Sequence, residues 1–241
     1  MSRVYAPGCA LLLYKPHLAE KVLAFLQAEE RGVADRRQAA AMTGAAGPGD
    51  FPEPAAIAEH TTCCRHQPGL EAGTVVINTC AGCDRRYREL YDGISTLSLW
   101  EVLARSDTFP FPDYHGAEMT VHDACPTRTE QRVHRAVRAL LGRMNVTVVE
   151  ARRSGTKSVC CGDSSFGIVP DERVKAQMRN RAAEMPCDDV VVYCVSCVKA
   201  MRIGGKRPRY LVDLLFGEET TIGTFEPAAW HAEIDAFIAD H

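Results

Sequence analysis

Long apolar runs are missing from this sequence. None approaches the ~18 residues that a membrane-spanning helix needs, and the apolar stretch nearest the start, residues 9–14, is too short for the core of a signal peptide. Excess positive charge is missing too. The 241 residues carry a net charge of −3, which is not the electrostatic footprint of a nucleic-acid-binding protein. These absences predict a cytoplasmic protein with no membrane span and no nucleic-acid partner.

Phosphate-binding loops are also absent. Neither G-x-x-x-x-G-K-[S/T] nor G-x-G-x-x-G occurs, and Gly204-Gly205 is only a turn signal. We therefore expect this chain to bind no nucleotide and no flavin. Its composition, 46% hydrophobic and 24% charged, is that of an ordinary globular protein.

Cysteine, by contrast, is abundant, with 11 residues. A chain of this length can bury its own core without disulfide bonds. With no export signal, the expected compartment is reducing, where structural disulfides are rare. Many cysteines in such a protein indicate metal ligands or redox groups.

The cysteines form two matching sets. Each set reads as a single cysteine, an adjacent pair and a C-x-x-C motif, with Cys187 left over. The first set is Cys9, Cys63, Cys64, Cys80 and Cys83, and the second is Cys125, Cys160, Cys161, Cys194 and Cys197. From the single cysteine to the C-x-x-C there are 70 intervening residues in the first set and 68 in the second.

The residues around the cysteines repeat as well. Basic residues follow each C-x-x-C (Arg85 and Arg88, then Lys199 and Arg202), and residues 99–103 parallel residues 211–215. Such self-similarity indicates an internal duplication. We predict one half in residues 1–107, a second in 117–216, a linker in 106–116 and a C-terminal capping helix in 217–241.

Strand and helix patterns alternate along both halves. Strands are predicted at 3–6, 74–77, 119–122 and 190–193, and helices at 17–29, 85–91, 97–105, 129–144, 171–184 and 227–239. Residues 39–54, rich in Ala, Gly and Pro, predict a loop. The alternation predicts an α/β fold of two tandem strand–helix repeats with small, mostly parallel sheets. Most of the cysteines follow strands, so each half could bring five thiols together at the carboxyl ends of its sheet.

Three chemistries could use such thiols. Structural zinc takes four ligands in a closed tetrahedron, but five thiols leave one over, and adjacent side chains on an extended backbone diverge. Thioredoxin-like dithiol chemistry uses a C-x-x-C that opens a helix, which leaves the other six cysteines of the two sets without a role. An iron–sulfur centre is also held by thiolates. The usual ferredoxin run is absent, and a pair plus a C-x-x-C plus a single cysteine suits a larger or bridged cluster.

The second set resembles the cysteine-rich CCG domain on the residues Cys125, Cys160-Cys161-Gly162 and Cys194-x-x-Cys197. That domain occurs twice in the B subunit of heterodisulfide reductases and in iron–sulfur subunits of glycolate, lactate, glycerol-3-phosphate and succinate oxidoreductases. In the heterodisulfide reductase subunit, each copy holds a non-cubane [4Fe-4S] cluster through five cysteines, and disulfides are cleaved there. The resemblance implies that all five cysteines of the second set are cluster ligands.

The first set departs from that pattern. Arg65 follows its adjacent pair where the second set has Gly162, and the pair lies only 15 residues before Cys80. That interval holds a turn and one strand, but no counterpart of helix 171–184. A second cluster is still expected there, of undetermined type. Because glycine lets the backbone turn tightly, the contrast predicts that the second half carries the chemistry.

Smaller signals concern the surroundings of the cysteines. His122, Gly162, Arg65 and His66 are candidate cofactor-contacting residues; for the histidines, hydrogen bonding to cluster sulfur or a loop contact competes with proton delivery. Cys187 is expected to be a buried small hydrophobe. The basic segment 199–209 is either a solvated face or a surface for an acidic partner or an anionic thiol.

Together these features predict an iron–sulfur oxidoreductase subunit with two [4Fe-4S] clusters, at least the second of them non-cubane. It would reduce a small disulfide, or oxidise thiols, with electrons from a partner protein that carries flavin or ferredoxin-type clusters. The alternatives are an electron-transfer subunit of an organic-acid oxidoreductase and, from another class, a zinc-bound structural protein.

Overall fold

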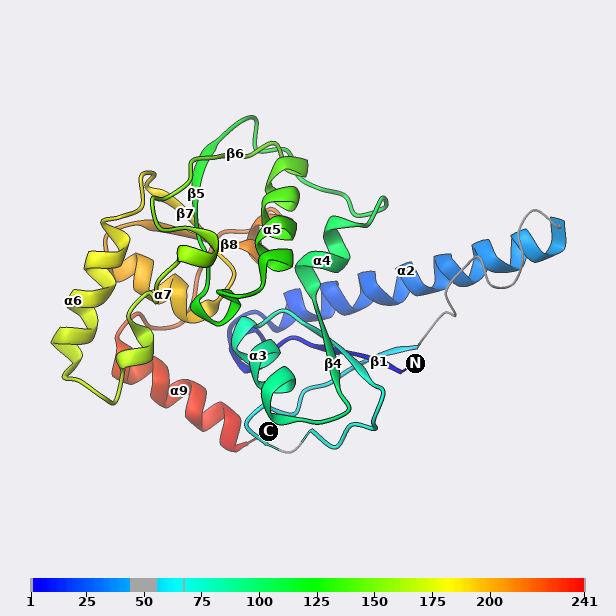
Figure 1. Cartoon of the computed structure of the whole chain (residues 1–241), viewed down its shortest axis with the longest axis horizontal. Coiled ribbons are helices and arrows are strands. Elements are labelled where there is room, and N and C mark those ends of the chain that lie inside the picture. Colours follow the sequence, from blue (N-terminus) through cyan, green and yellow to red (C-terminus); the bar gives the residue numbers. More distant parts are fainter. Residues whose placement is uncertain (1, 44–55, 67, 241) are drawn as a thin grey trace.

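The computed structural model describes residues 2–43, 56–66 and 68–240, with the side chains of 34–43 left out. Within these residues the chain forms two four-stranded sheets, and every strand pair is parallel (Figure 1). The first sheet has the order β2-β1-β3-β4 and the second β6-β5-β7-β8. The strands are β1 Arg3–Ala6, β2 Ile57–Glu59, β3 Val75–Asn78, β4 Ser95–Ser98, β5 Glu118–His122, β6 Thr147–Val148, β7 Asp189–Val192 and β8 Arg207–Tyr210.

The two sheets repeat the same topology, because β1 to β4 take the places of β5 to β8 in order. In each sheet the central pair ends on a matched register: Ala6 opposes Asn78, and His122 opposes Val192. The α/β fold with two similar cysteine repeats is therefore confirmed. The domain boundaries at 107, 117 and 217 stay a prediction.

Helices connect the strands. They are α1 Cys9–Tyr14, α2 Pro16–Thr43, α3 Ala81–Leu90, α4 Leu99–Ala104, α5 Gln131–Arg143, α6 Asp171–Ala182, α7 Val195–Ile203, α8 Leu211–Leu215 and α9 Pro227–Ala239. Short helices α4 and α8 each follow the last strand of their sheet, which confirms the predicted match of 99–103 with 211–215. None of the helices in the described residues is long and apolar enough to cross a membrane.

Some predicted elements were wrong in extent. Helix α2 continues to Thr43, so residues 39–43 are helical instead of part of a loop; residues 44–54 of that predicted loop lie outside the described residues. The segment 97–105 was predicted as one helix, but Ser98 ends β4 and caps α4, where its side chain accepts a hydrogen bond from the Trp100 amide. Helix α3 begins earlier than predicted, directly after Cys80.

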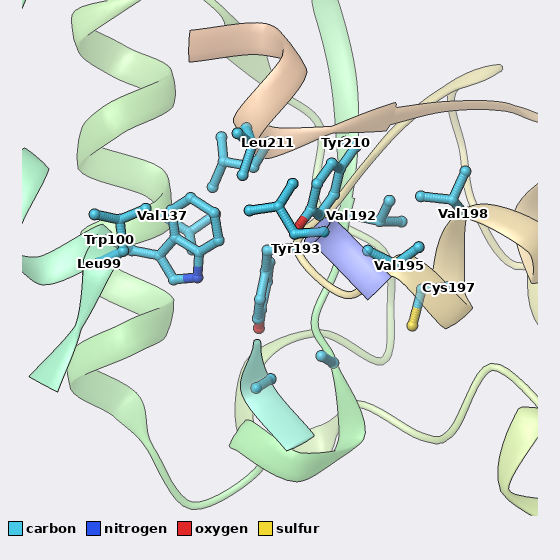
Figure 2. Close-up of a cluster of buried hydrophobic side chains, with 14 of the residues drawn as sticks. Leu99, Trp100, Val137, Val192, Tyr193, Val195, Cys197, Val198, Tyr210 and Leu211 are labelled. Carbon is cyan, nitrogen blue, oxygen red and sulfur yellow. The ribbon is translucent and has the colours of Figure 1, made fainter. Parts of the chain in front are cut away.

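A shared apolar core joins the halves. Helix α4 of the first half packs on α5 of the second, and the rings of Trp100 and Tyr193 meet edge to face with 6.4 Å between centroids. Figure 2 shows these two rings side by side in the buried cluster, with Cys197 at its edge. An ion pair from Arg88 to Glu130, 3.0 Å long, also crosses between the halves. The packing fixes the two cysteine sets relative to each other.

Candidate metal centres

Corresponding cysteines follow their strands at identical offsets. Cys9 and Cys125 come three residues after the ends of β1 and β5, and Cys80 and Cys194 come two residues after β3 and β7. Since the carboxyl ends of neighbouring parallel strands meet at one edge of a sheet, each single cysteine is brought beside its C-x-x-C. Cys80 and Cys194 are also the N-caps of α3 and α7.

In each half, the five thiols form one hydrogen-bonded chain, and the order is the same in both. The chain in the first half, the first thiol site, runs Cys9–Cys63–Cys64–Cys83–Cys80. In the second half, the second thiol site, it runs Cys125–Cys160–Cys161–Cys197–Cys194. All eleven cysteines are free thiols. The predicted convergence of five thiols in each half is thus observed, despite the different position of the first pair along the chain.

Negative charge collects on the first thiol of each adjacent pair. Hydrogen bonds from Cys64 and Cys9 lower the pKa of Cys63 to about 2. Cys125 and Cys161 likewise hold the pKa of Cys160 well below its usual range. The pKa of a thiol that donates such a hydrogen bond shifts upward. The pKa of Cys64 rises to about 12, chiefly because it donates to Cys63. A thiolate surrounded by thiol donors is the electronic arrangement of a soft-metal site.

The adjacent thiols do not diverge as an extended backbone would require, because each pair lies in a turn. The backbone N–H of Arg65 donates to Cys63 Sγ at 3.5 Å, and that of Gly162 donates to Cys160 Sγ at 3.3 Å. Arg65 and Gly162 therefore play the same backbone role. Adjacent cysteines were expected to be poor ligands for one metal ion, because their side chains would diverge. That expectation was wrong, because the turn keeps the two thiols together.

Gly162 adopts φ +110°, a left-handed conformation that side chains rarely tolerate. A Cβ there would lie 3.0 Å from the Met178 amide nitrogen and 3.1 Å from Gln177 Cβ, both on α6. The tight turn is as predicted, but the space beside it is filled by α6. The described residues between Cys64 and Cys80 contain no helix, and the first half therefore tolerates Arg65 at this position.

Gly8 is a site residue that the sequence analysis missed. Its φ is +86°, and a Cβ would lie 2.8 Å from Cys80 Cβ and 3.6 Å from Cys83 Sγ. The backbone before Cys9 thus touches the C-x-x-C directly. Its position immediately before the first single cysteine was the available signal.

A cavity of about 200 Å³ lies against the first thiol site. All five thiols of that site line it, together with Cys194 of the second site. Arg65, Arg85 and Arg86 line it as well, and no acidic side chain of the described residues does. The open space thus lies at the first site, whereas the glycine contrast predicted the second half as the reactive one.

Helix α9 forms the apolar wall of this cavity through Trp230, Ile234 and Ile238. The helix predicted at residues 227–239 is present as α9, and it packs against α1. The capping unit 217–241 stays a prediction. Asp235 on the same helix pairs with Arg65 at 2.8 Å. Helix α9 thus holds one of the cavity arginines in place.

His122 lies at the second thiol site with its side chain fully buried. Its ring shares a space with Cys161 and Cys197, and the ligand atoms of the three residues all lie within 4.8 Å of one another. Burial and the nearby charge of Arg181 lower the pKa of His122 to about 4, so the imidazole is neutral. His66, by contrast, is exposed and does not line the cavity.

Cys187 contacts neither site. It precedes β7, at the opposite end of that strand from Cys194, and its amide donates to Thr120 Oγ1 at 3.1 Å. Its side chain is half-buried, and the prediction of a buried residue was therefore wrong in degree.

The basic segment after the second C-x-x-C is divided between core and surface. Lys199 is fully buried, so it cannot dock a partner. Its Nζ lies 2.6 Å from Asp163 Oδ1 and 4.0 Å from the centroid of Trp230. Arg202 is exposed and, with Arg207 and Arg209, lines a surface groove of about 390 Å³. The segment is amphipathic because it belongs to α7 and β8.

Comparison with known families agrees with the second half of this geometry. The family model of the cysteine-rich CCG domain matches residues 119–202. These residues are similar to the CCG domain. The match begins in β5 and ends in α7, and it includes all five cysteines of the second thiol site. The first half lies outside the matched residues, but it repeats the sheet topology and the thiol contacts of the second half.

One curated relative is a protein of Chromohalobacter salexigens named "Probable membrane-anchored ferredoxin". It is 28% identical over 99 residues, which cover 39% of this chain and 15% of the relative. The chain thus spans a small part of that protein's length. No solved structure matches the chain.

Proposed function

We propose that this protein is an iron–sulfur oxidoreductase subunit that binds a [4Fe-4S] cluster at each thiol site, at least the second of them non-cubane. It would reduce a disulfide, or oxidise thiols, with electrons from a partner protein. The observation that carries the proposal is the cavity at the first thiol site, lined by six thiols and three arginines. A purely structural site has no use for such an opening.

The thiol sites fit an iron–sulfur group in their donor chemistry. Each offers five free sulfurs, one more than zinc takes in a closed structural site. Cys63 and Cys160 are already favoured as thiolates, the form that binds metal. When bound, such a cluster supplies one-electron chemistry and iron positions that can accept a further sulfur. The ten ligands would be the five cysteines of each thiol site.

The cavity residues would bind and orient the substrate. Arg65 and Arg85 are partly neutralised by Asp235 and Glu89, which do not line the cavity. Arg86 forms no ion pair among the described residues, and its positive charge suits a thiol or disulfide with carboxylate or sulfonate groups. Trp230 and Ile234 shield the same space from water, which strengthens that attraction. Cys194 at the edge brings the second thiol site to the same substrate.

The electron donor would be a protein with flavin or ferredoxin-type clusters. The groove of Arg202, Arg207 and Arg209 is a suitable docking place for an acidic partner. Eleven free thiols suit a reducing compartment, and we place the protein in the cytoplasm on that ground.

The second candidate is an electron-transfer module that passes electrons to another subunit and binds no disulfide. The relative named a ferredoxin favours it. The deciding experiment is iron and acid-labile sulfide analysis of anaerobically purified protein, with EPR spectra before and after thiols or disulfides are added. More than one cluster per chain and a thiol-dependent spectral change support disulfide chemistry. Clusters without that change favour the module, and stoichiometric zinc without iron contradicts both.

A further inference from the structure

The two ring nitrogens of His122 have different surroundings. One ring nitrogen of His122 lies within 4.8 Å of the sulfurs of Cys161 and Cys197, and Nε2 has no hydrogen-bond partner among the described residues. Nδ1 lies 3.2 Å from Nε of Arg181. A buried polar nitrogen without a partner is costly, so Nε2 is expected to interact with something that the protein binds at this site.

Arg181 decides which nitrogen carries the proton. A guanidinium can only donate, so Nδ1 must offer its lone pair, and the proton of the neutral ring is on Nε2. Arg181 cannot easily turn away, because its side chain is buried and also donates to the Arg153 carbonyl oxygen at 2.9 Å and to Ser158 Oγ at 3.3 Å. Glu184 pairs with the same guanidinium.

We propose that the Nε2–H of His122 donates a hydrogen bond to sulfur of the cluster at the second thiol site and raises the reduction potential of that cluster, with Arg181 as the positioning residue. This inference rests on the proposed function. Reduction adds negative charge to a cluster, and a donor aimed at its sulfur stabilises that charge. If Nε2 instead bound iron directly, the proton of the neutral ring would have to lie on Nδ1. That proton would then point at the Nε–H of Arg181, which is itself a donor.

Among the described residues, the first thiol site has no counterpart of His122. The residue three positions before Cys9 is Ala6, where the second site has His122 before Cys125. The inferred hydrogen bond therefore belongs to the second thiol site, and it should raise the potential of only one of the two clusters.

Redox titration of the cluster-loaded protein, followed by EPR, tests the inference. In H122L we expect the midpoint potential of one cluster to fall by about 59 mV, a tenfold change in a one-electron equilibrium, while the other cluster keeps its potential. H122Q, whose amide N–H can donate, should restore much of the difference. R181M should lower the same potential, and H66L, at an exposed histidine, is the matched control. Equal potentials in wild type and H122L would overturn the inference.

Pulsed EPR on the unmodified protein keeps the test independent of folding in the variants. With ¹⁵N-labelled histidine, a donor gives a weak nitrogen coupling and an exchangeable deuteron coupling in D₂O. A strong nitrogen coupling would mean ligation, and no coupling at all would mean no contact; either would overturn the inference and leave the proposed function standing. Protein that binds no iron would overturn both.

Discussion

Lys199 Nζ lies 2.6 Å from Asp163 Oδ1 in the interior of the second half. Lys199 is on α7, two residues after Cys197, and Asp163 lies two residues after Cys161. The ion pair therefore fastens two segments that supply neighbouring thiols. His231 of α9 contacts the same carboxylate oxygen at 3.2 Å and stacks on Phe166.

Replacing Lys199 with Met should lower the free energy of unfolding by roughly 1–3 kcal/mol, because the half-buried Asp163 carboxylate loses a charged partner and retains the His231 contact. Urea unfolding of the purified variants measures the loss. R202M is the matched control: Arg202 is exposed on the same helix, and a change within about 0.5 kcal/mol is expected. Equal losses in the two variants would contradict the structural role of Lys199.

Replacing Gly162 with Ala should destabilise the protein more than replacing Gly167 with Ala. Both glycines have positive φ, which costs a side chain roughly 1–2 kcal/mol. Only at Gly162 does the new Cβ also meet α6, whereas nothing lies within 4 Å at Gly167. Overpacking there should add roughly 1–3 kcal/mol, measured as the difference between the urea midpoints. Equal urea midpoints for the two variants would show that α6 moves aside with no loss of stability.

Replacing Arg86 with Gln should weaken the response to anionic thiols roughly tenfold, since a hydrogen bond to a charged group contributes about 1.5–3 kcal/mol. Titrations would compare mercaptoacetate with the neutral 2-mercaptoethanol, which should be unaffected. R173Q removes the same charge from an exposed position on α6, outside the cavity lining. A similar loss for both thiols would mean that Arg86 supports the site and does not select the substrate.

Replacing Cys64 or Cys161 with Ala should each remove the iron of one cluster, because either change breaks one thiol chain. Replacing Cys187 should leave the iron content intact. Since the cavity lies at the first thiol site, the thiol-dependent EPR change should vanish in the Cys64 variant and persist in the Cys161 variant. The opposite pattern would return the chemistry to the second half, as the glycine contrast predicted.

Much of the fold followed from periodicity in the sequence. Strands β1 and β7 could be predicted because they are apolar and buried, and their positions before cysteines predicted convergence of the thiols. Strand β8, with the sequence Arg-Pro-Arg-Tyr, could not be predicted. It lies at the edge of its sheet, where charged side chains and proline are tolerated. Strand β4 was not predicted, because its last residue, Ser98, is also the N-cap of α4.

The site was less predictable than the fold, because its remaining contacts join residues far apart in the chain. Arg181 is 59 positions from His122, and nothing in an apparently solvated helix marks it as buried. In the sequence, Lys199 is one of several basic residues close together. Only the structure shows that Asp163 and Trp230 surround its side chain. The cavity depends on α9, a segment without cysteines. The spacing of residues within a sequence motif does not reveal partners that lie far away in the chain.

Helix α9 also has a consequence for the order in which the protein matures. Every cysteine of both thiol sites precedes Pro227, the first residue of α9, in the chain. At synthesis rates of about 5–20 residues per second, both sets of thiols are complete before their cover exists. The face of the first thiol site that α9 covers is therefore open until this helix has been synthesised. Helix α9 then packs over thiols that are already in place.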